Sequence, residues 1–115
     1  MDITVKQYQD YLLGHYGDHG KEQSLFMKLV EEIGEVAEVL NMRAGRKAPD
    51  GSDLPERLGS ELADVIHYAA AIAAINGIDL TETILRKDKT AAAKYHHDVN
   101  LETFLLQRHN ETAHP

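Results

Sequence analysis

"LVEEIGEVAEVL", residues 29–40, combines the apolar periodicity of a core helix with an unusual density of negative charge. Its apolar residues recur at intervals of three and four, the spacing of one helical face. Four glutamates nevertheless lie between positions 31 and 38. Such a helix can pack into a core only if its carboxylates are solvated, paired or bound to a cation.

The whole chain predicts an all-α fold, a helical bundle of four main helices. Helical periodicity recurs along it, whereas the strict alternation typical of strands does not. Three capping pairs mark helix starts, because a side-chain oxygen can accept a hydrogen bond from a free backbone N–H three residues on. These pairs are Thr4 with Gln7, Asp53 with Glu56, and Asp79 with Glu82.

The predicted helices cover about residues 4–16, 21–44, 53–77 and 79–97, with a short fifth helix over 100–108. Breaks are expected at "GDHG" (17–20), at Gly45 and in the loop "GRKAPDGSD" (45–53). A length of 115 residues favours a single domain over residues 1–115. We expect its core within residues 21–97 and a frayed polar tail over 109–115.

Composition excludes several classes of protein and site. Without cysteine the chain has no disulfide and no thiolate metal site. A net charge of −7 argues against a nucleic-acid polymer as partner, since acidic surfaces repel phosphate backbones. The N-terminus lacks the layout of a signal peptide, and no uninterrupted apolar run is long enough to span a membrane. A cytoplasmic location is therefore expected.

On the second helix, one apolar stripe is expected to face the core. It consists of Phe26, Leu29, Val30, Ile33, Val36, Ala37 and Leu40. Glu31, Glu38 and Met42 fall on the opposite side, which is expected to be solvated. Glu32 and Glu35 lie three residues apart and flank the stripe, where like charges at a partly desolvated edge would repel each other.

The third helix repeats this arrangement. Its apolar stripe is formed by Leu58, Leu62, Val65, Ala69 and Ile72. Glu61 and Asp64 lie three residues apart on one side of it, where an unpaired carboxylate is costly. Cationic residues are scarce here, and only Arg57 is well placed on this helix. Four carboxylates facing each other across two helices therefore indicate a bound cation that the sequence does not encode.

Carboxylates without cysteine are hard oxygen ligands, which suit Mg²⁺ or Mn²⁺ better than Zn²⁺ or copper. His67 follows Asp64 by three residues and could be read as part of an Asp-x-x-His ligand set. Four-helix di-iron sites use Glu-x-x-His instead, and His67 is turned away from the Glu61 side. A structural or surface role for His67 is the favoured interpretation.

With these residues identified, the sequence resembles the MazG-like all-α nucleoside triphosphate pyrophosphohydrolases. The signature of that superfamily is E-x-x-E, a spacer, and E-x-x-D. Here "EIGE" (32–35) supplies the first pair and "ELAD" (61–64) the second, each in its apolar context. The resemblance covers about residues 24–95.

The resemblance implies that Glu32, Glu35, Glu61 and Asp64 hold Mg²⁺, with Mn²⁺ as a substitute. It further implies hydrolysis of a nucleoside triphosphate substrate to the monophosphate and pyrophosphate, as in nucleotide-pool housecleaning. A carboxylate would orient or deprotonate the attacking water. Glu35 is the first candidate for this catalytic role, and Glu31 is the alternative.

The fourth helix departs from the family pattern, which often has Lys, Asn four later, Arg three beyond, and then an aromatic residue. Here "KDKTAAAKY" supplies Lys87, Ala91, Lys94 and Tyr95. Lys87 and Lys94 are candidates for contacting substrate phosphates, and exposed solubilising charge is the alternative interpretation. Lysine at position 94 lacks the bidentate fork of arginine, and alanine at position 91 supplies no amide.

Assembly as a homodimer or a dimer of dimers is expected, since the alanine-rich third helix allows close helix approach. Base stacking would fall to a tyrosine or to Phe26, although each of these residues is better interpreted as part of a core or interface. Two alternative functions stay open at this point. One is a phosphoribosyl-ATP-type pyrophosphohydrolase, and the other is a non-catalytic helical interaction protein.

Overall fold

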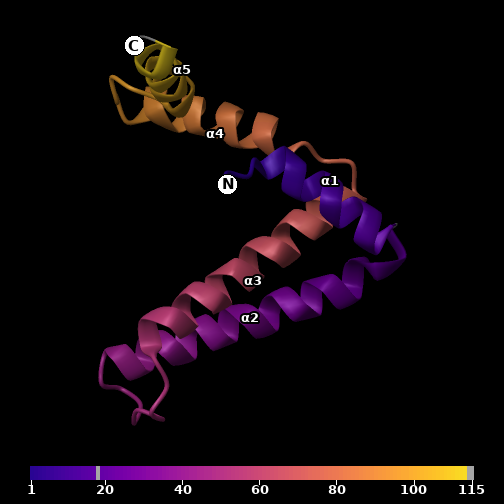
Figure 1. Ribbon diagram of the computed structural model, residues 1–115, viewed down its shortest axis with the longest axis vertical. Coiled ribbons are helices and arrows are strands. Elements are labelled where there is room, and N and C mark those ends of the chain that lie inside the picture. The colour runs from indigo at the N-terminus through magenta and orange to yellow at the C-terminus, as the bar shows by residue number, and fades with distance from the viewer. Residues whose placement is uncertain (18, 114–115) are drawn as a thin grey trace. The chain divides into compact units, whose positions relative to one another are not determined.

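The structure, a computed structural model, describes residues 1–17 and 19–113, and within them every regular element is helical (Figure 1). The elements are α1 (Val5–Tyr16), the 3₁₀ helix η1 (His19–Lys21), α2 (Glu22–Arg43), α3 (Leu54–Ile75), α4 (Leu80–Lys94) and α5 (Leu101–Ala113). They form two compact units, Met1–Ile78 and Asp79–Pro115. The all-α prediction is confirmed.

The three predicted caps are formed. Thr4 Oγ1 accepts a hydrogen bond from the Gln7 backbone N–H at 3.0 Å, and the Gln7 side chain accepts one from the Thr4 N–H at 2.9 Å. Asp53 and Asp79 each accept a hydrogen bond from the backbone N–H three residues on, at 3.2 Å. Local sequence therefore sets where α1, α3 and α4 begin.

In the first unit, α2 and α3 run antiparallel beside each other, and α1 packs against α3 (Figure 1). The buried core consists of Leu12 from α1, Leu25, Val39 and Met42 from α2, and Ala70, Ala71, Ala73, Ala74 and Ile75 from α3. The alanines of α3 allow close approach of its neighbours, because a methyl side chain adds little to the helix radius. The second half of α3 is thus the centre of this unit.

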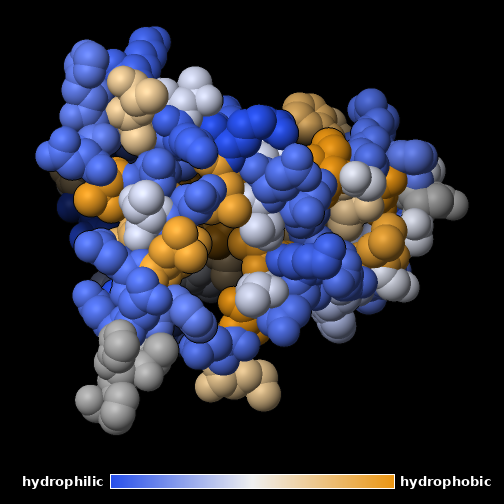
Figure 2. All heavy atoms as spheres, turned by 90° about the horizontal axis from the view of Figure 1, so that it is seen from above, coloured by the Kyte–Doolittle hydropathy of each residue, from blue (hydrophilic) through white to orange (hydrophobic). Residues whose placement is uncertain are grey.

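The predicted core stripe of α2 is wrong in part. Phe26, Val30, Ile33 and Leu40 are about half exposed in the chain, and hydrophobic side chains reach the surface among hydrophilic ones (Figure 2). Leu25 and Val39 are buried instead, and so is Met42, which was expected on the solvated side. The reason is that α2 carries two apolar stripes, and periodicity alone does not indicate which of them meets α3.

The face of α2 that is turned towards α3 includes a carboxylate. Leu25, Glu32 and Val39 are spaced by seven residues, which places them on the same side of a helix. The flanking members are buried, so Glu32 extends from the side of α2 that makes the core. On α3, Leu62 is likewise exposed despite its place in the predicted stripe, whereas Leu58, Val65 and Ile72 are half-buried.

In the second unit, α4 packs against α5, and Ala92 is buried. Asp88 Oδ2 accepts a hydrogen bond from the Leu101 backbone N–H at 2.6 Å, and Asn100 Oδ1 accepts one from the Thr103 N–H at 2.9 Å. The start of α5 is therefore fixed by two side chains. The helix runs on to Ala113, so the predicted end at residue 108 is wrong.

At residue 108, where the helix was predicted to end, the Arg108 guanidinium lies 5.5 Å from the centre of the Phe104 ring, one turn earlier in α5. Asp18, in the predicted break between α1 and α2, lies outside the described residues. The same holds for residues 114–115 of the tail.

Among the described helices, α3 is long and apolar enough to suit a membrane span by length and composition, with a mean hydropathy of 1.3 over its most apolar window. Its position supplies another reason for this composition. Neighbours on two sides, α1 and α2, pack against it. Only 28% of that window is buried, so packing against α1 and α2 accounts for part of the apolar composition and not for all of it.

Candidate metal centre

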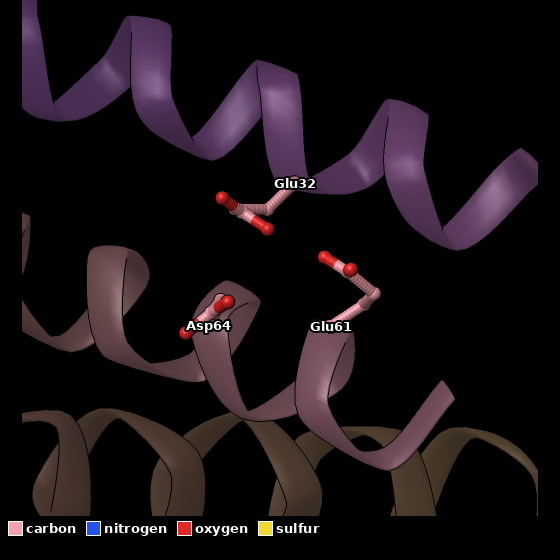
Figure 3. Close-up of side chains that lie close together, drawn as sticks. All are labelled: Glu32, Glu61 and Asp64. Atoms are coloured by element: carbon pink, nitrogen blue, oxygen red, sulfur yellow. The ribbon is translucent and has the colours of Figure 1, made fainter. Parts of the chain in front are cut away.

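Three carboxylates meet between α2 and α3. Glu32 comes from α2, and Glu61 and Asp64 come from successive turns of α3 (Figure 3). One oxygen of each lies within 4.8 Å of an oxygen of each of the others. The close-up shows Glu32 and Glu61 directed towards each other across the space between the helices. The structure thus brings together three of the four carboxylates that were predicted to face each other across the helix pair, and their role as metal ligands stays a prediction.

The neighbouring carboxylates change the pKa of Glu32. The pKa of Glu32 is raised from its ordinary value of 4.5 to about 7. A hydrogen bond between the Glu32 and Glu61 side chains is the largest cause, followed by burial and by repulsion from Asp64, Glu61 and Glu35. Glu32 therefore keeps a proton up to near neutral pH and shares it with Glu61 through that hydrogen bond, because the neighbouring negative charges disfavour its ionised form.

This donor set fits a hard divalent cation. The group supplies only carboxylate oxygens, which are preferred by Mg²⁺ and Mn²⁺. A cation here would replace the shared proton and relieve the repulsion that raises the pKa of Glu32. No cysteine is available in the chain, and no histidine belongs to this group.

Glu35, the fourth predicted ligand, has a different partner. Its Oε2 lies 3.2 Å from Arg57 Nη2, and the side chain is 46% exposed. None of its oxygens belongs to the three-carboxylate group. Its charge nevertheless contributes to the raised pKa of Glu32, one turn earlier on α2.

The two glutamates expected on the solvated side of α2 differ. Glu31 is 65% exposed and lies 3.2 Å from Lys28 Nζ, as expected for a solvated residue. Glu38 is more enclosed and forms ion pairs with Lys47 at 2.5 Å and with Arg57 at 3.6 Å. The hydrogen bond from Lys47 is the main cause that lowers the pKa of Glu38. Glu38 thus lies towards solvent as predicted, but it is ion-paired there, which the prediction did not include.

His67 belongs to an aromatic cluster at the α1–α3 contact. Its Nε2 lies 2.6 Å from the Tyr16 hydroxyl and its Nδ1 lies 3.2 Å from the Tyr8 hydroxyl. Both ring nitrogens are thus used in holding α1 to α3, and His67 is not part of the three-carboxylate group. The structural interpretation of His67 is confirmed. Burial is the main cause that raises the pKa of Tyr16, followed by Tyr68 and Tyr8.

In the second unit, Lys87 and Lys94 lie on one face of α4 and line a surface hollow of about 400 Å³. Arg86, Thr90, Ala91 and Tyr95 complete its lining. Arg86 and Thr90 were not among the predicted site residues, although their four-residue spacing is a signal that places them on the same face. Arg86, Lys87 and Lys94 make this hollow cationic, and Ala91 forms part of its wall.

Comparison with known proteins gives two matches. A family model described as the MazG nucleotide pyrophosphohydrolase domain matches residues 21–97. The crystal structure of iMazG from Vibrio DAT 722 superposes with a TM-score of 0.57 at 26% identity, covering 84% of this chain and 100% of that chain. No curated protein matches the chain. The family match spans α2, α3 and α4, and therefore all three carboxylates of the group.

The raised pKa of Glu32 predicts a pH dependence of stability in metal-free protein. Because the folded state binds this proton more tightly than the unfolded chain, the stabilisation is complete below pH 4.5 and is lost as pH rises through about 7. Melting temperatures between pH 4.5 and 8 should therefore fall more steeply in the wild type than in Glu32→Gln. Glu31→Gln, an exposed neighbour, is the control and should follow the wild type. Parallel profiles for wild type and Glu32→Gln would contradict the shared proton.

Proposed function

The chain belongs to the MazG nucleotide pyrophosphohydrolase family, and we propose that it hydrolyses a (deoxy)nucleoside triphosphate to the monophosphate and pyrophosphate with the help of Mg²⁺. The observation that supports this proposal is the group of Glu32, Glu61 and Asp64 between α2 and α3. These carboxylates repel one another without a cation, and they suit a metal that also binds a triphosphate.

In this proposal Glu32, Glu61 and Asp64 hold the cation, with Mn²⁺ as a substitute for Mg²⁺. Bound there, Mg²⁺ would neutralise charge that develops on the triphosphate and make a nearby water more acidic. The three ligand side chains extend from two helices that pack against each other, so their oxygens are already close together before a cation binds.

Glu35 is proposed to act beside this group, as a fourth ligand and as the carboxylate that orients or deprotonates the attacking water. Its half-exposed position one turn from Glu32 supports that role. Glu31 is the alternative, although it is directed to solvent and paired with Lys28. For contacts to substrate phosphates we propose Lys87 and Lys94, because both contribute positive charge to the hollow on α4.

Two alternative functions differ from this proposal in what they require of the carboxylates. A phosphoribosyl-ATP-type pyrophosphohydrolase would use the same carboxylates on a different nucleotide, so it is an alternative substrate within the proposed chemistry. A non-catalytic helical interaction protein would have no need for three carboxylates brought within 4.8 Å on the core side of a helix pair. The clustering therefore favours an enzyme.

The proposed role is housecleaning of the nucleotide pool in the cytoplasm. A free nucleotide accompanied by Mg²⁺ is compatible with the net charge of −7, because the cation reverses the local field, whereas a nucleic-acid polymer or a membrane partner has no comparable support.

We also propose that the chain forms a homodimer or a dimer of dimers through an apolar face on α2 and α3. Ile33 and Leu62 directly follow Glu32 and Glu61, so each is rotated about 100° from the carboxylate group. Because α2 and α3 are antiparallel, equal rotations place both residues on the same side of the pair. Each is about half exposed, as are Phe26, Val30 and Ile66. An uncovered surface of this kind is typical of an interface.

Pyrophosphate release from a panel of ribonucleotides, deoxyribonucleotides and phosphoribosyl-ATP, with Mg²⁺ present, tests the enzymatic proposal. We expect release from at least one nucleotide, and a loss of about 100-fold or more on Asp64→Asn or Glu61→Gln, because each removes a charged metal ligand. Glu56→Gln, an exposed residue of the same helix, should keep wild-type activity. No release from any nucleotide, or release that Asp64→Asn and Glu61→Gln leave unchanged, would refute the proposal.

The proposed interface predicts the effect of a charge placed within it. Ile33→Glu should shift the protein from dimer or tetramer to monomer in sedimentation experiments, because burying an unpaired carboxylate in the interface costs roughly several kcal/mol. Ser24→Glu adds the same charge to α2 outside the apolar face and should leave the assembly unchanged. A wild-type chain that sediments as a monomer at all concentrations would contradict this part of the account.

A further inference from the structure

Arg57 connects the predicted catalytic region to the loop between α2 and α3. It lies in the first turn of α3, and its side chain is 22% exposed. Nη2 lies 3.2 Å from Glu35 Oε2 and 3.6 Å from Glu38 Oε2, whereas Nη1 lies 2.9 Å from Asp50 Oδ2. One guanidinium therefore joins α2, α3 and the loop.

The loop has a second attachment to α2. Lys47 Nζ lies 2.5 Å from Glu38 Oε1, and Glu38 is also bound by Arg57. Asp50, the loop partner of Arg57, is itself held by Ser52, whose backbone N–H and hydroxyl both donate to Asp50 Oδ1. The position of the Arg57 guanidinium is thus determined from the α2 side and from the loop side.

The Arg57 contact and metal ligation make opposite demands on Glu35. A carboxylate oxygen that accepts a hydrogen bond from a guanidinium offers fewer lone pairs to a cation, and two positive charges at one carboxylate repel each other. The geometry agrees with such a competition: Glu35 Oε2 accepts a hydrogen bond from Arg57, and no Glu35 oxygen belongs to the group of Glu32, Glu61 and Asp64. Arg57 and a cation at that group therefore compete for Glu35.

We propose that Arg57 holds Glu35 in the metal-free protein, and that Glu35 becomes a ligand only when a divalent cation displaces the guanidinium. Arg57 is thus a positioning residue that sets metal affinity. Because coupling between two equilibria is reciprocal, cation binding also loosens the hold of Arg57 on Glu35 and thereby changes the contacts of the loop. The inference rests on the metal site of the proposed function but not on hydrolysis.

Calorimetric titration with Mg²⁺ alone, without nucleotide, tests this competition on the full chain. Arg57→Gln should bind Mg²⁺ about twofold to fivefold more tightly than the wild type, which is the range that a partly exposed ion pair contributes. Arg57→Lys keeps the charge but lacks the fork that reaches Glu35 and Asp50 together, so it should also bind more tightly. Circular dichroism confirms that each variant is helical, and Arg57→Lys serves if Arg57→Gln does not fold.

A matched control separates competition from a general change of field. Lys28→Gln removes a positive charge that interacts with Glu32 but makes no contact with Glu35. It should change Mg²⁺ affinity less than Arg57→Gln does. In a Glu35→Gln background, replacing Arg57 by Gln should have no effect beyond that of Lys28→Gln, because the residue for which Arg57 competes is gone.

An equal gain in affinity from Arg57→Gln in both backgrounds would overturn the proposal, and so would unchanged affinity in Arg57→Gln and Arg57→Lys. Absence of Mg²⁺ binding in the wild type and all variants would overturn it together with the metal site. Tight Mg²⁺ binding that follows the predicted order, without pyrophosphate release from any nucleotide, would support this inference while refuting the proposed hydrolysis.

Discussion

Mutual repulsion of carboxylates on the core side of a helix pair is the constraint on which the site depends. Glu32 lies on the same face of α2 as the buried Leu25 and Val39, opposite Glu61 and Asp64. Such a group is stable only if a proton or a cation is shared within it, which is why the pKa of Glu32 rises to about 7. The negative charge of residues 29–40 thus has a physical role, because Glu32 belongs to this carboxylate group.

The surroundings of the group follow from this constraint. Glu32 keeps a proton beside Glu61 and Asp64, whereas Glu35 and Glu38 form ion pairs with Arg57 and Lys47. Arg57 therefore compensates part of the negative charge that gathers on this stretch of α2. The α2–α3 loop takes part through Lys47, which pairs with Glu38, and Asp50, which pairs with Arg57.

Features that depend on local sequence were predictable. The caps at Thr4, Asp53 and Asp79 and the carboxylate pairs require only neighbours three residues apart. The orientation of α2 was not predictable, because it carries two apolar stripes and only tertiary packing selects between them. The Arg57–Glu35 pair escaped prediction for a related reason, since it joins residues 22 positions apart and depends on how α2 and α3 align.

In the proposed site, a divalent cation is expected to take the place of the proton that Glu32 shares with Glu61. Calorimetric titration with Mg²⁺ at pH 6.5, in buffers of different ionisation enthalpy, measures the number of protons released on binding most directly. We expect release of a fraction of a proton at pH 6.5 and almost none at pH 8.5, because the pKa of Glu32 is about 7. Binding with no proton release at pH 6.5, or no binding at either pH, would contradict it.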